Sequence, residues 1–270
     1  KSDRWAAKSP RYRADLEPVL EYLTEKIGKR DVTRLTQADI YQAMDANKHR
    51  VRFANYLPVA ISMIAKEVIR RRWLTENPAL GIERLEVPKE RRRPHIPWTD
   101  WAVDTWRADA QEQPRLIFEL GVGTVQRPSD WLQFAYSDYD GDTLHLRQGK
   151  TGVPLVLPCT VALKAALDSA KASLPYSPHP NLRIIHNKDG SPMSYRTMAQ
   201  IMRAERKRLG VEAFDLHALR YRGVMELAWA GCTDDEIMSY SGHATKEMVR
   251  KYAGEARQIM RARQAREKRQ

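Results

Sequence analysis

One segment divides this chain into two halves whose sequence patterns differ. Residues 86–99 read EVPKERRRPHIPWT, with three prolines and a cluster of lysine and arginine. Proline fixes φ and lacks a backbone N–H, so prolines this closely spaced disfavour both helix and strand. The segment therefore predicts a basic, semi-extended linker. We place the linker itself at residues 91–96, between a domain of residues 1–90 and a second domain of residues 97–270.

The first domain has the apolar spacing of helices throughout. Residues 16–27 carry apolar side chains at helical intervals, and we expect Pro18 only in the first turn of that helix. Thr36 is a suitable N-cap for the short helix QADIYQAM. A longer helix should end at the Asn77-Pro78 step. Its buried face should contain Leu57, Ile61, Ile64, Ala65, Val68 and Trp73.

The second domain mixes helices with a short hairpin. The segments DTLHLRQ and VPLVLPC are typical of strands and flank the turn GKTG, which is a hairpin signal. The segment RIIH predicts one further short strand. The chain is therefore predicted to be mainly α-helical with a small antiparallel sheet. Helical patterns also continue to the end of the chain, after helices near residues 99–109, 113–122, 160–173 and 194–209.

The charge balance favours a polyanionic partner. Lysine and arginine number 46 against 34 aspartate and glutamate, a formal charge of +12, and the pI is about 9.7. Nucleic acid is the first candidate for a chain this basic. In the linker, Arg91, Arg92 and Arg93 could contact phosphate oxygens, although a solvated charge run explains them equally well. The other candidate DNA contacts are Lys48, Arg50 and Arg52.

Several classes of protein are disfavoured by what the sequence lacks. No segment approaches the roughly 18 apolar residues of a membrane span, and no signal peptide opens the chain. Cys159 and Cys232 lack zinc-ligand spacing, so neither a disulfide nor a structural zinc is expected. The segment SDYDGD resembles a calcium loop, but its glycine comes too early and no glutamate closes it. We read it as a polar turn, and expect a cytoplasmic protein without a metal.

Two cationic motifs lie at expected helix entrances. In FDLHALRYRG, His217 and Arg220 are spaced to share one face of a helix, for which Asp215 is a good N-cap. His217 then lies in the first turn, where backbone N–H groups favour an anion. In TVQRPSD, Pro128 suits the first helical position, so Arg127 can reach two phosphate oxygens from the helix entrance. Taken singly, each is more often a surface cation in a salt bridge.

Two further motifs add a lysine, a histidine and a tyrosine. Lys150 in QGKTG is carried at the tip of the predicted hairpin, where it can reach into a groove. The segment GHATKEMVRKY places Tyr252 one basic helical run beyond the Gly242-His243 pair. An isolated tyrosine on a helix is ordinarily a packing residue. Only its combination with the other motifs indicates a different role.

The order and spacing of these residues resemble the tyrosine recombinase, or phage integrase, family over nearly the whole chain. TVQRPSD is similar to the family's first arginine motif, QGKTGVPLVLP to its lysine-bearing hairpin, and HALRYRG to its His-x-x-Arg box. SYSGHATKEMVRKY matches the Gly-His box with its tyrosine. RLTQADI and RRRWLTENPALGIERL resemble the family's helical, SAM-like core-binding domain. The sequence departs from the family at Val125-Gln126, where a glycine is common, and at Asp130, where glutamate is more frequent.

The resemblance implies one catalytic site, formed by Arg127, Lys150, His217, Arg220, His243 and Tyr252. Tyr252 would attack the scissile phosphate and give a covalent 3′-phosphotyrosine, which a 5′-hydroxyl can reseal without ATP. Arginine stays charged at any working pH, so the two arginines can bind the non-bridging oxygens in place of a metal. Lys150 would protonate the leaving 5′-oxygen, His217 would assist proton transfer from the tyrosine, and His243 would hydrogen-bond the phosphate. No cofactor is implied.

The resemblance also implies how such a chain works on DNA. A helical core-binding domain and a mixed α/β catalytic domain would close around duplex DNA at a specific core site. Four protomers would act on two duplexes through a Holliday junction, integrating or excising a phage or mobile element. DNA-bending or directionality factors are further candidate partners, and the protein would be nucleoid-associated when bound. The basic tail, residues 255–270, would dock on a neighbouring protomer, although a frayed end is the simpler interpretation.

Three other functions remain open at this point. A type IB topoisomerase shares the chemistry but works as a monomer, and the core-binding resemblance favours the recombinase. A non-catalytic DNA-binding protein would not need the full set of six residues. A metal-dependent nuclease would need a carboxylate cluster, and the sequence offers none that is convincing. Because the chain opens on Lys1, an arm-type DNA-binding domain can precede it.

Overall fold

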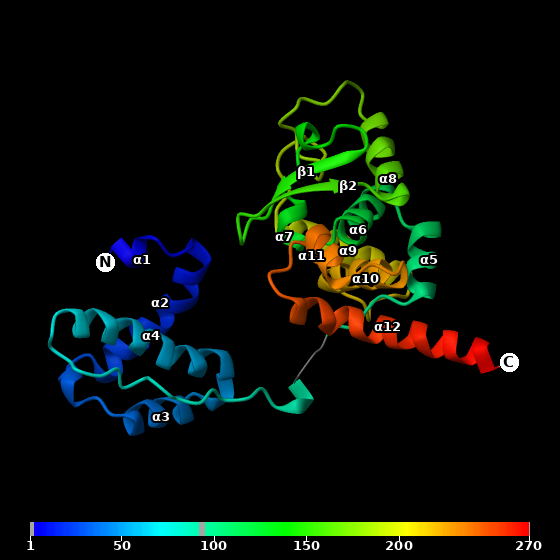
Figure 1. Ribbon diagram of the computed structural model, residues 1–270. Coiled ribbons are helices and arrows are strands. Elements are labelled where there is room, and N and C mark those ends of the chain that lie inside the picture. The colour runs from blue at the N-terminus through cyan, green and yellow to red at the C-terminus, as the bar shows by residue number, and fades with distance from the viewer. Residues whose placement is uncertain (1–2, 92–94, 270) are drawn as a thin grey trace. The chain divides into compact units, whose positions relative to one another are not determined.

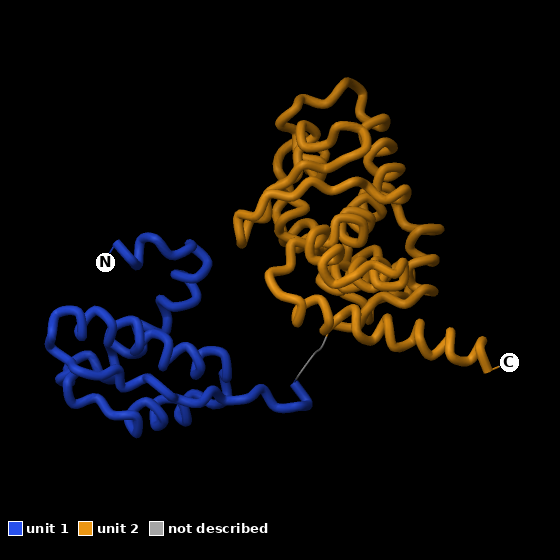
Figure 2. Tube along the Cα trace, in the orientation of Figure 1, with its two compact units in different colours: residues 1–93 blue, residues 94–270 orange. Residues whose placement is uncertain are grey.

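The computed structural model describes residues 3–91 and 95–269, and the chain divides into two compact units. The first unit comprises residues 1–93 and the second residues 94–270 (Figure 2). Each unit has a hydrophobic core of its own. None of the helices in the described ranges combines the length and the hydrophobicity of a membrane-spanning segment. Arg92 and Arg93, two of the candidate DNA contacts, lie outside the described residues.

The first unit is built from helices. Its helix α3 begins with a capping box, in which the Thr36 hydroxyl accepts from the Asp39 N–H and the Asp39 carboxylate accepts from the Thr36 N–H, so the predicted N-cap is confirmed. Buried aliphatic side chains from α2, α3 and α4 form the core. The helices are α1 (Asp3–Ala6), α2 (Pro10–Ile27), α3 (Gln37–Ala46) and α4 (Val51–Arg70), with 3₁₀ turns at Val32–Arg34, Lys48–Arg50 and Lys89–Arg91 (Figure 1).

Two prolines lie inside these helices. We expected Pro18 in a first turn, but α2 begins at Pro10 and carries Pro18 in its interior, so that expectation was wrong. Pro58 lies within α4 in the same way. A proline inside a helix costs about 3 kcal/mol, whereas burying one Leu or Val contributes about 1.5–3 kcal/mol. Leu16 and Val19 are both buried beside Pro18, so the apolar face outweighs the missing hydrogen bond.

Helix α4 ends well before the Asn77-Pro78 step that was expected to stop it. Its last residue is Arg70, and Arg72 has a φ of +59°. A residue in the left-handed region cannot continue a right-handed helix. Trp73 therefore lies beyond the helix with 62% of its surface exposed, and Ile64 is 40% exposed. The assignment of Trp73 and Ile64 to the buried face was wrong.

The second unit is built around two helices that are buried along most of their length, α6 (Glu112–Thr124) and α10 (Leu216–Trp229). They approach each other closely, because a Cβ at Gly223 would lie 2.3 Å from the Val122 carbonyl oxygen. Helices α8 and α9 pack on α6, while α11 and α12 pack on α10 (Figure 1). The other helices are α5 (Asp100–Asp109), α7 (Pro128–Trp131), α8 (Val161–Ala172), α9 (Tyr195–Arg208), α11 (Asp234–Ser241) and α12 (Lys246–Arg269).

The small sheet is the predicted hairpin. Strands β1 (Thr143–Arg147) and β2 (Pro154–Pro158) pair antiparallel, with Leu144 opposite Leu157. The residues between them form the turn, which projects from the body of the unit (Figure 1). The predicted fold class, mainly α-helical with a small antiparallel sheet, is therefore confirmed.

The segment RIIH, residues 183–186, forms no strand, so that prediction was wrong. Only isolated bridges pair Arg183 with Ala135 and His186 with Pro192. Ile184 and Ile185 are both buried, so the segment lacks the alternating exposure of a strand on a sheet with one solvent face. Burial alone explains its apolar character.

Candidate active site

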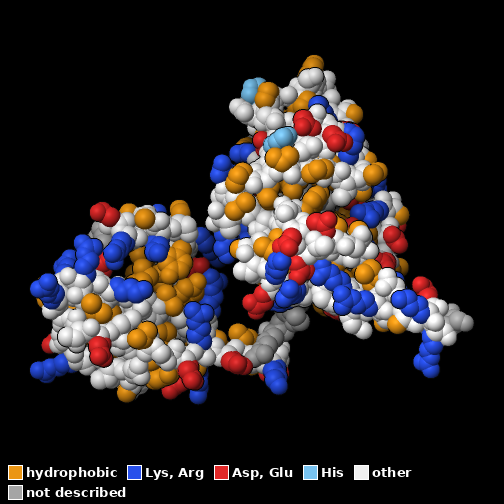
Figure 3. All heavy atoms as spheres, in the orientation of Figure 1, with side chains coloured by type: hydrophobic (Ala, Val, Ile, Leu, Met, Phe, Trp, Pro, Cys, Tyr) orange, Lys and Arg blue, Asp and Glu red, His pale blue; other side chains and the backbone are white. Residues whose placement is uncertain are grey.

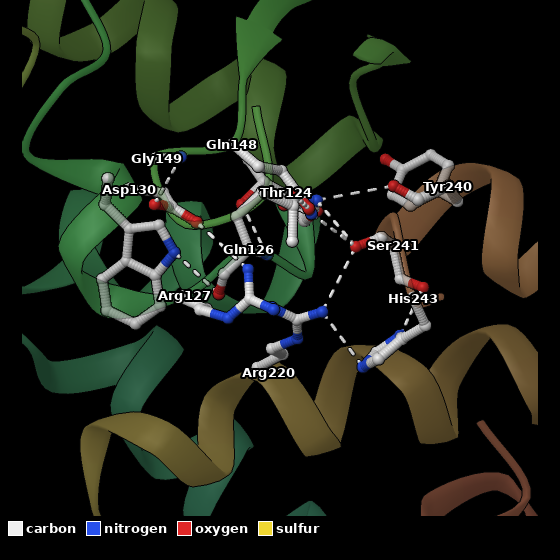
Figure 4. A network of polar contacts seen from close by, with 12 residues as sticks. Thr124, Gln126, Arg127, Asp130, Gln148, Gly149, Arg220, Tyr240, Ser241 and His243 are labelled. Carbon is white, nitrogen blue, oxygen red and sulfur yellow. Dashed lines mark hydrogen bonds and ion pairs between the residues drawn. The ribbon is translucent and has the colours of Figure 1, made fainter. Parts of the chain in front are cut away.

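Chain reversals and one buried helix bring the candidate residues together in the second unit. Val125 caps the C-terminus of α6 with a φ of +56° that turns the chain, and Arg127 follows as the N-cap of α7. Gly242 caps the C-terminus of α11 with a φ of +66° that is typical of glycine, and His243 follows. Arg220 lies on α10, which crosses α6 closely. The loop residues Arg127 and His243 therefore lie beside Arg220 (Figure 4).

Arg127 and Arg220 bring two guanidinium groups together, of which Arg220 is buried and Arg127 is partly buried (Figure 4). Arg220 is 3% exposed, and the Arg127 side chain is 20% exposed. Burial, and then the charge of Arg127, lower the pKa of Arg220 to about 10, which leaves it charged at neutral pH. The ion pair of Arg127 with Asp130 spans 4.0 Å between Nη1 and Oδ2, too long for a hydrogen bond. Within the described residues, Nη1 of each arginine is buried without a hydrogen-bond partner. Such donors suit an anion.

His243 is held as a neutral imidazole. Arg220 Nη2 donates to its Nε2 at 3.0 Å, and its Nδ1 lies 2.5 Å from the Ser241 hydroxyl. Because Nε2 accepts, we assign the ring proton to Nδ1, which donates to Ser241; that hydroxyl donates in turn to the Ile237 carbonyl. Burial, and then the charges of Arg220 and Arg127, lower the pKa of His243 to about 4. In this tautomer His243 orients Arg220.

Tyr252 lies against a second tyrosine that the sequence analysis did not single out. The rings of Tyr252 and Tyr221 stack with centroids 3.8 Å apart and an angle of 15° between their planes. Tyr221 is buried on α10, next to Arg220. Burial, and then a hydrogen bond with Tyr252, raise the pKa of Tyr221. Tyr252 is also close enough to Arg220 to interact electrostatically with it.

His217 belongs to a short row of rings that leads to this tyrosine pair. Its ring centroid lies 5.1 Å from Tyr221 and 4.8 Å from His95. Burial, and then the charges of His95 and Arg220, lower the pKa of His217. His95 Nδ1 lies 2.5 Å from Asp215 Oδ2. Burial alone would raise the pKa of Asp215, but the hydrogen bonds from His95 and from the Ala218 N–H outweigh it and lower that pKa.

Lys150 is carried beside this cluster without joining it. Its side chain is exposed in the hairpin turn and makes no hydrogen bond or ion pair within the described part of the chain. Its backbone neighbour is fixed, because the Gly149 N–H donates to Asp130 Oδ1 at 3.2 Å. The structure thus gathers five of the six predicted residues into one cluster and leaves the Lys150 side chain free at its edge.

The candidate DNA contacts of the first unit have partners of their own. The Arg50 guanidinium lies 3.6 Å from the centre of the Phe53 ring and donates to Asn47. Arg52 pairs with Asp15 at 2.6 Å. Lys48 and Arg91 are exposed. On the face in Figure 3, lysine and arginine side chains occur on both units and follow the projecting end of α12, where residues 261–269 are exposed.

Sequence reasoning missed three residues of the cluster: Tyr221, Ser241 and Gln148. Tyr221 could have been found, because it is one helical turn beyond His217 and adjacent to Arg220. Gln148 could also have been found. It is next in the series of inward-facing residues of β1, Leu144 and Leu146, and a polar residue at such a position is unusual. No local pattern marks Ser241. Among the described residues, no group of three or more His, Cys, Asp or Glu side chains is placed to hold a metal ion.

Comparison with known proteins places this arrangement in a family. The family model described as "Phage integrase family" matches residues 103–258. Two curated proteins named integrase, from Escherichia phage HK022 and Enterobacteria phage 434, are each 26% identical, over 197 and 201 residues. The alignments cover 72% and 70% of this chain, but 48% and 47% of the relatives. The chain therefore spans about half the length of these relatives.

Solved integrase structures share the fold of this chain. A lambda integrase dimer bound to a COC′ core site has a TM-score of 0.74 at 20% identity, over 92% of this chain and 89% of that chain. The Tn1549 transposon integrase in complex with circular intermediate DNA has a TM-score of 0.73 at 15% identity, over 91% and 90%. The family model spans more than half of the chain, and its range includes the whole cluster from Arg127 to Tyr252. This chain belongs to the phage integrase family.

Proposed function

We propose that this chain is a site-specific DNA recombinase that cuts and rejoins duplex DNA through a covalent phosphotyrosine. The observation that carries the proposal is the pair Arg127 and Arg220, whose buried and unpartnered Nη1 groups suit the oxygens of one phosphodiester. The charges of Arg127 and Arg220 repel each other, and an anion between them relieves that repulsion. Support also comes from the relatives, which are named integrases, and from similar structures that hold a core site or a Holliday junction.

Tyr252 is the nucleophile of the proposed reaction. Its oxygen attacks the scissile phosphorus, the new O–P bond forms, and the bond from phosphorus to the 5′-oxygen breaks. The phenol proton passes toward His217, whose pKa is lowered chiefly by burial, so the ring is neutral and can accept it. Lys150 gives a proton to the departing 5′-oxygen. The products are a 3′-phosphotyrosine and a free 5′-hydroxyl, and attack by a second 5′-hydroxyl reverses both bond changes.

The arginines stabilise the charge that develops during this transfer. Each binds a non-bridging oxygen, and removing one such donor ordinarily lowers the rate by about 10²–10³. His243 holds Arg220 through Nε2, and it can bond the phosphate itself only when Nε2 gains a proton and Arg220 releases it. Because the guanidiniums supply the positive charge that a metal supplies in many nucleases, we propose that no divalent metal or ATP is needed.

The rest of the chain would bind and align DNA. We propose that residues 1–90 form a core-binding domain, that residues 91–96 link it to the catalytic domain of residues 97–270, and that both domains contact one duplex at a specific core site. Four copies would act on two duplexes, with DNA-bending or directionality factors as further partners. The exposed basic end of α12 is available to dock on a neighbouring copy.

A nicked suicide duplex tests the proposal. A pool of such duplexes with randomised core sequences is incubated with the protein in EDTA, and covalent complexes are recovered from a denaturing gel and sequenced. We expect an adduct that joins a DNA 3′-phosphate to Tyr252 and a recovered set of related core sequences. Products with free ends that form only when magnesium is added would overturn the proposal in favour of a metal-dependent nuclease.

A further inference from the structure

Gln148 is a buried amide beside the Lys150 turn that the proposed reaction does not use. It follows β1 directly and is 1% exposed. Leu144 and Leu146 are the buried residues of β1, so Gln148 continues their inward series. A polar side chain at an inward position is unfavourable unless its donors and its acceptor are bonded.

The Gln148 amide joins three separate segments (Figure 4). Its Nε2 donates to Gln126 Oε1 at 2.6 Å and to the Ser241 carbonyl at 3.0 Å. Its Oε1 accepts from the Thr151 hydroxyl at 2.6 Å. Gln126 directly precedes Arg127, Ser241 is the last residue of α11, two residues before His243, and Thr151 follows Lys150. One amide therefore binds the arginine loop, the histidine loop and the lysine turn together.

The glycine before His243 makes room for this amide. A Cβ on Gly242 would lie 2.4 Å from Gln148 Nε2, well inside van der Waals contact. Gly242 also has a φ of +66°, which favours glycine on backbone grounds. Gly242 is therefore required for two independent reasons, its positive φ and the close approach of the Gln148 amide. The second reason depends on Gln148.

The Lys150 turn is fixed at its base and free at its tip. Gln148 anchors it by its side chain, and the Gly149 N–H anchors it on Asp130, one turn beyond Arg127. The Arg147 guanidinium donates across the turn to the Gly152 carbonyl at 2.6 Å. Lys150 itself has no partner within the described residues. The turn is thereby held against the arginine pair while the ammonium group remains available.

We infer that Gln148 is a positioning residue, which sets the register of the Lys150 turn against the Arg127 and His243 loops. This inference rests on the proposed function, in which Lys150 protonates the leaving 5′-oxygen. A proton donor must lie within hydrogen-bond reach of the atom it protonates. Without the Gln148 amide, the turn would be anchored only through its backbone, and the ammonium group would spend less time at the leaving oxygen.

A sulfur-bridged substrate separates this role from a purely structural one. A thiol ionises near pH 8.5, so a bridging 5′-sulfur leaves without a proton donor, whereas a 5′-oxygen does not. The rates of covalent adduct formation are measured on both substrates for the intact chain and for Gln148→Met, Lys150→Ala and Arg220→Ala. Gln133→Met is the matched control, because Gln133 is exposed and its side chain makes no hydrogen bond in the described structure.

We expect Gln148→Met to lose about tenfold or more on the oxygen substrate, toward the 10²–10⁴ expected for loss of the acid itself in Lys150→Ala. Both variants should recover most of the unmodified rate on the sulfur substrate, and Arg220→Ala should stay slow on both. Rescue of Lys150→Ala without rescue of Gln148→Met would overturn the inference and leave the proposed function intact. Failure of sulfur to rescue Lys150→Ala would overturn the assignment of the acid, and the inference with it.

A second variant covers the case in which Gln148→Met does not fold, as judged by its thermal transition. Gln126→Met removes the acceptor of the 2.6 Å bond from Gln148 Nε2 and leaves the Ser241 bond in place. We expect Gln126→Met to lower the rate of adduct formation on the oxygen substrate by less than Gln148→Met does, and the sulfur substrate to restore that rate. A loss that sulfur does not rescue would mean that the bridge supports the arginine loop instead of the lysine turn.

Discussion

The two units of this chain differ in what they bury. In the first unit the described core consists of aliphatic and aromatic side chains, and Asn47 is its single buried residue of polar or charged type. The second unit buries many more, and most of them are Arg220 itself and the residues around the arginine pair: Thr124, Gln126, Asp130, Gln148, Ser241 and His243. The first core is what folding alone requires, whereas the second contains groups that folding alone would disfavour.

This difference separates residues that stabilise the fold from residues that serve the site and reduce stability. An apolar side chain in a core stabilises the fold through the area it removes from water. A buried guanidinium with an unpartnered donor lowers stability instead, because desolvation and a like charge both oppose it. Substitutions in the two regions should therefore have opposite effects. At the site they should reduce activity more than stability, and in the first core they should reduce stability more than activity.

Removal of the Tyr252 oxygen should give the largest effect on activity with the least effect on the fold. Tyr252→Phe keeps the ring that stacks on Tyr221, but it cannot form the covalent bond, so all adduct should disappear while DNA binding persists. The measurement is a denaturing gel with a nicked duplex of the recovered core sequence. Tyr176→Phe, at an exposed position, is the control. A normal adduct from Tyr252→Phe would show that another tyrosine attacks, and Tyr221 would be the first to test.

Arg220→Met should separate chemistry from stability. We expect adduct formation to fall by about 10²–10³, because one donor to the phosphoryl oxygens is lost. The free energy of unfolding should stay the same or rise, because a buried and repelled charge is replaced by a flexible apolar chain. Rates and thermal unfolding of the same preparation check both parts. A large loss of stability would mean that the bonds of Arg220 to Ser241 and His243 hold the loop together.

Leu16→Ala, in the first unit, should reduce stability without reducing activity. Leu16 is fully buried on α2, so the substitution should lower the stability of that unit by about 2–5 kcal/mol. Amide hydrogen exchange along α2 in the intact chain measures the loss. The adduct rate on saturating DNA should not change, since no residue of the second unit is altered. A strong fall in that rate at saturation would mean that the first core contributes to the chemical step.

The stability of the second unit should decrease as the pH is lowered, because His243 then becomes protonated. Its pKa is lowered to about 4 by burial and then by the two arginines, whereas an unfolded histidine titrates near 6.5. The unfolded state therefore binds a proton first as the pH drops. The stability that His243 contributes is complete above about pH 6.5 and is lost toward pH 4, by about 2–3 kcal/mol. His217 shifts in the same direction.

Thermal unfolding between pH 7 and pH 4 checks this dependence. His243→Gln should flatten the dependence in that window, and His179→Gln, at an exposed position, should not. If His243→Gln leaves the slope unchanged, the acid sensitivity belongs to other groups, and the neutral tautomer that orients Arg220 would lose its support.

The sequence predicted the elements that local physics controls. The hairpin around GKTG, the capped α3 and the first turn of α10 with His217 all follow from spacing, turn residues and N-caps. The interior position of Pro18 and the early end of α4 could not be read locally, because core burial decided the first and the left-handed Arg72 the second.

The candidate site was predictable where its motifs are local. The six residues came from family motifs, and the structure gathers five of them. The contacts between motifs could not be read from the sequence, because they join positions far apart in the chain. The stack of Tyr221 on Tyr252 and the bridge from Gln148 to Gln126 depend on how α10, α12, the hairpin and the α6 loop pack together.

The smallest expected effect tests whether strain is stored beside the site. Val125 is buried with a φ of +56°, a region that disfavours β-branched residues, and it belongs to the Val125-Gln126 pair, where the sequence departs from the glycine expected before the arginine. Val224, in the same core cluster, is equally buried on the ordinary backbone of α10. Val224→Ala and Val125→Ala delete the same atoms, so the transfer and cavity contributions should nearly cancel between them.

The difference in unfolding free energy between these two variants then reports the strain. Val224→Ala should be the more destabilising, because only Val125→Ala relieves a β-branched residue in the left-handed region, which costs on the order of 1–3 kcal/mol. Val125→Gly should be milder still than Val125→Ala, because glycine avoids a left-handed penalty of about 1–2 kcal/mol and loses only about 0.4–1 kcal/mol through the freedom of the unfolded chain. Thermal or denaturant unfolding of the three variants gives the order directly. If Val125→Gly proves the least stable of the three, packing of the Val125 side chain outweighs its backbone, and the turn before Arg127 is unstrained.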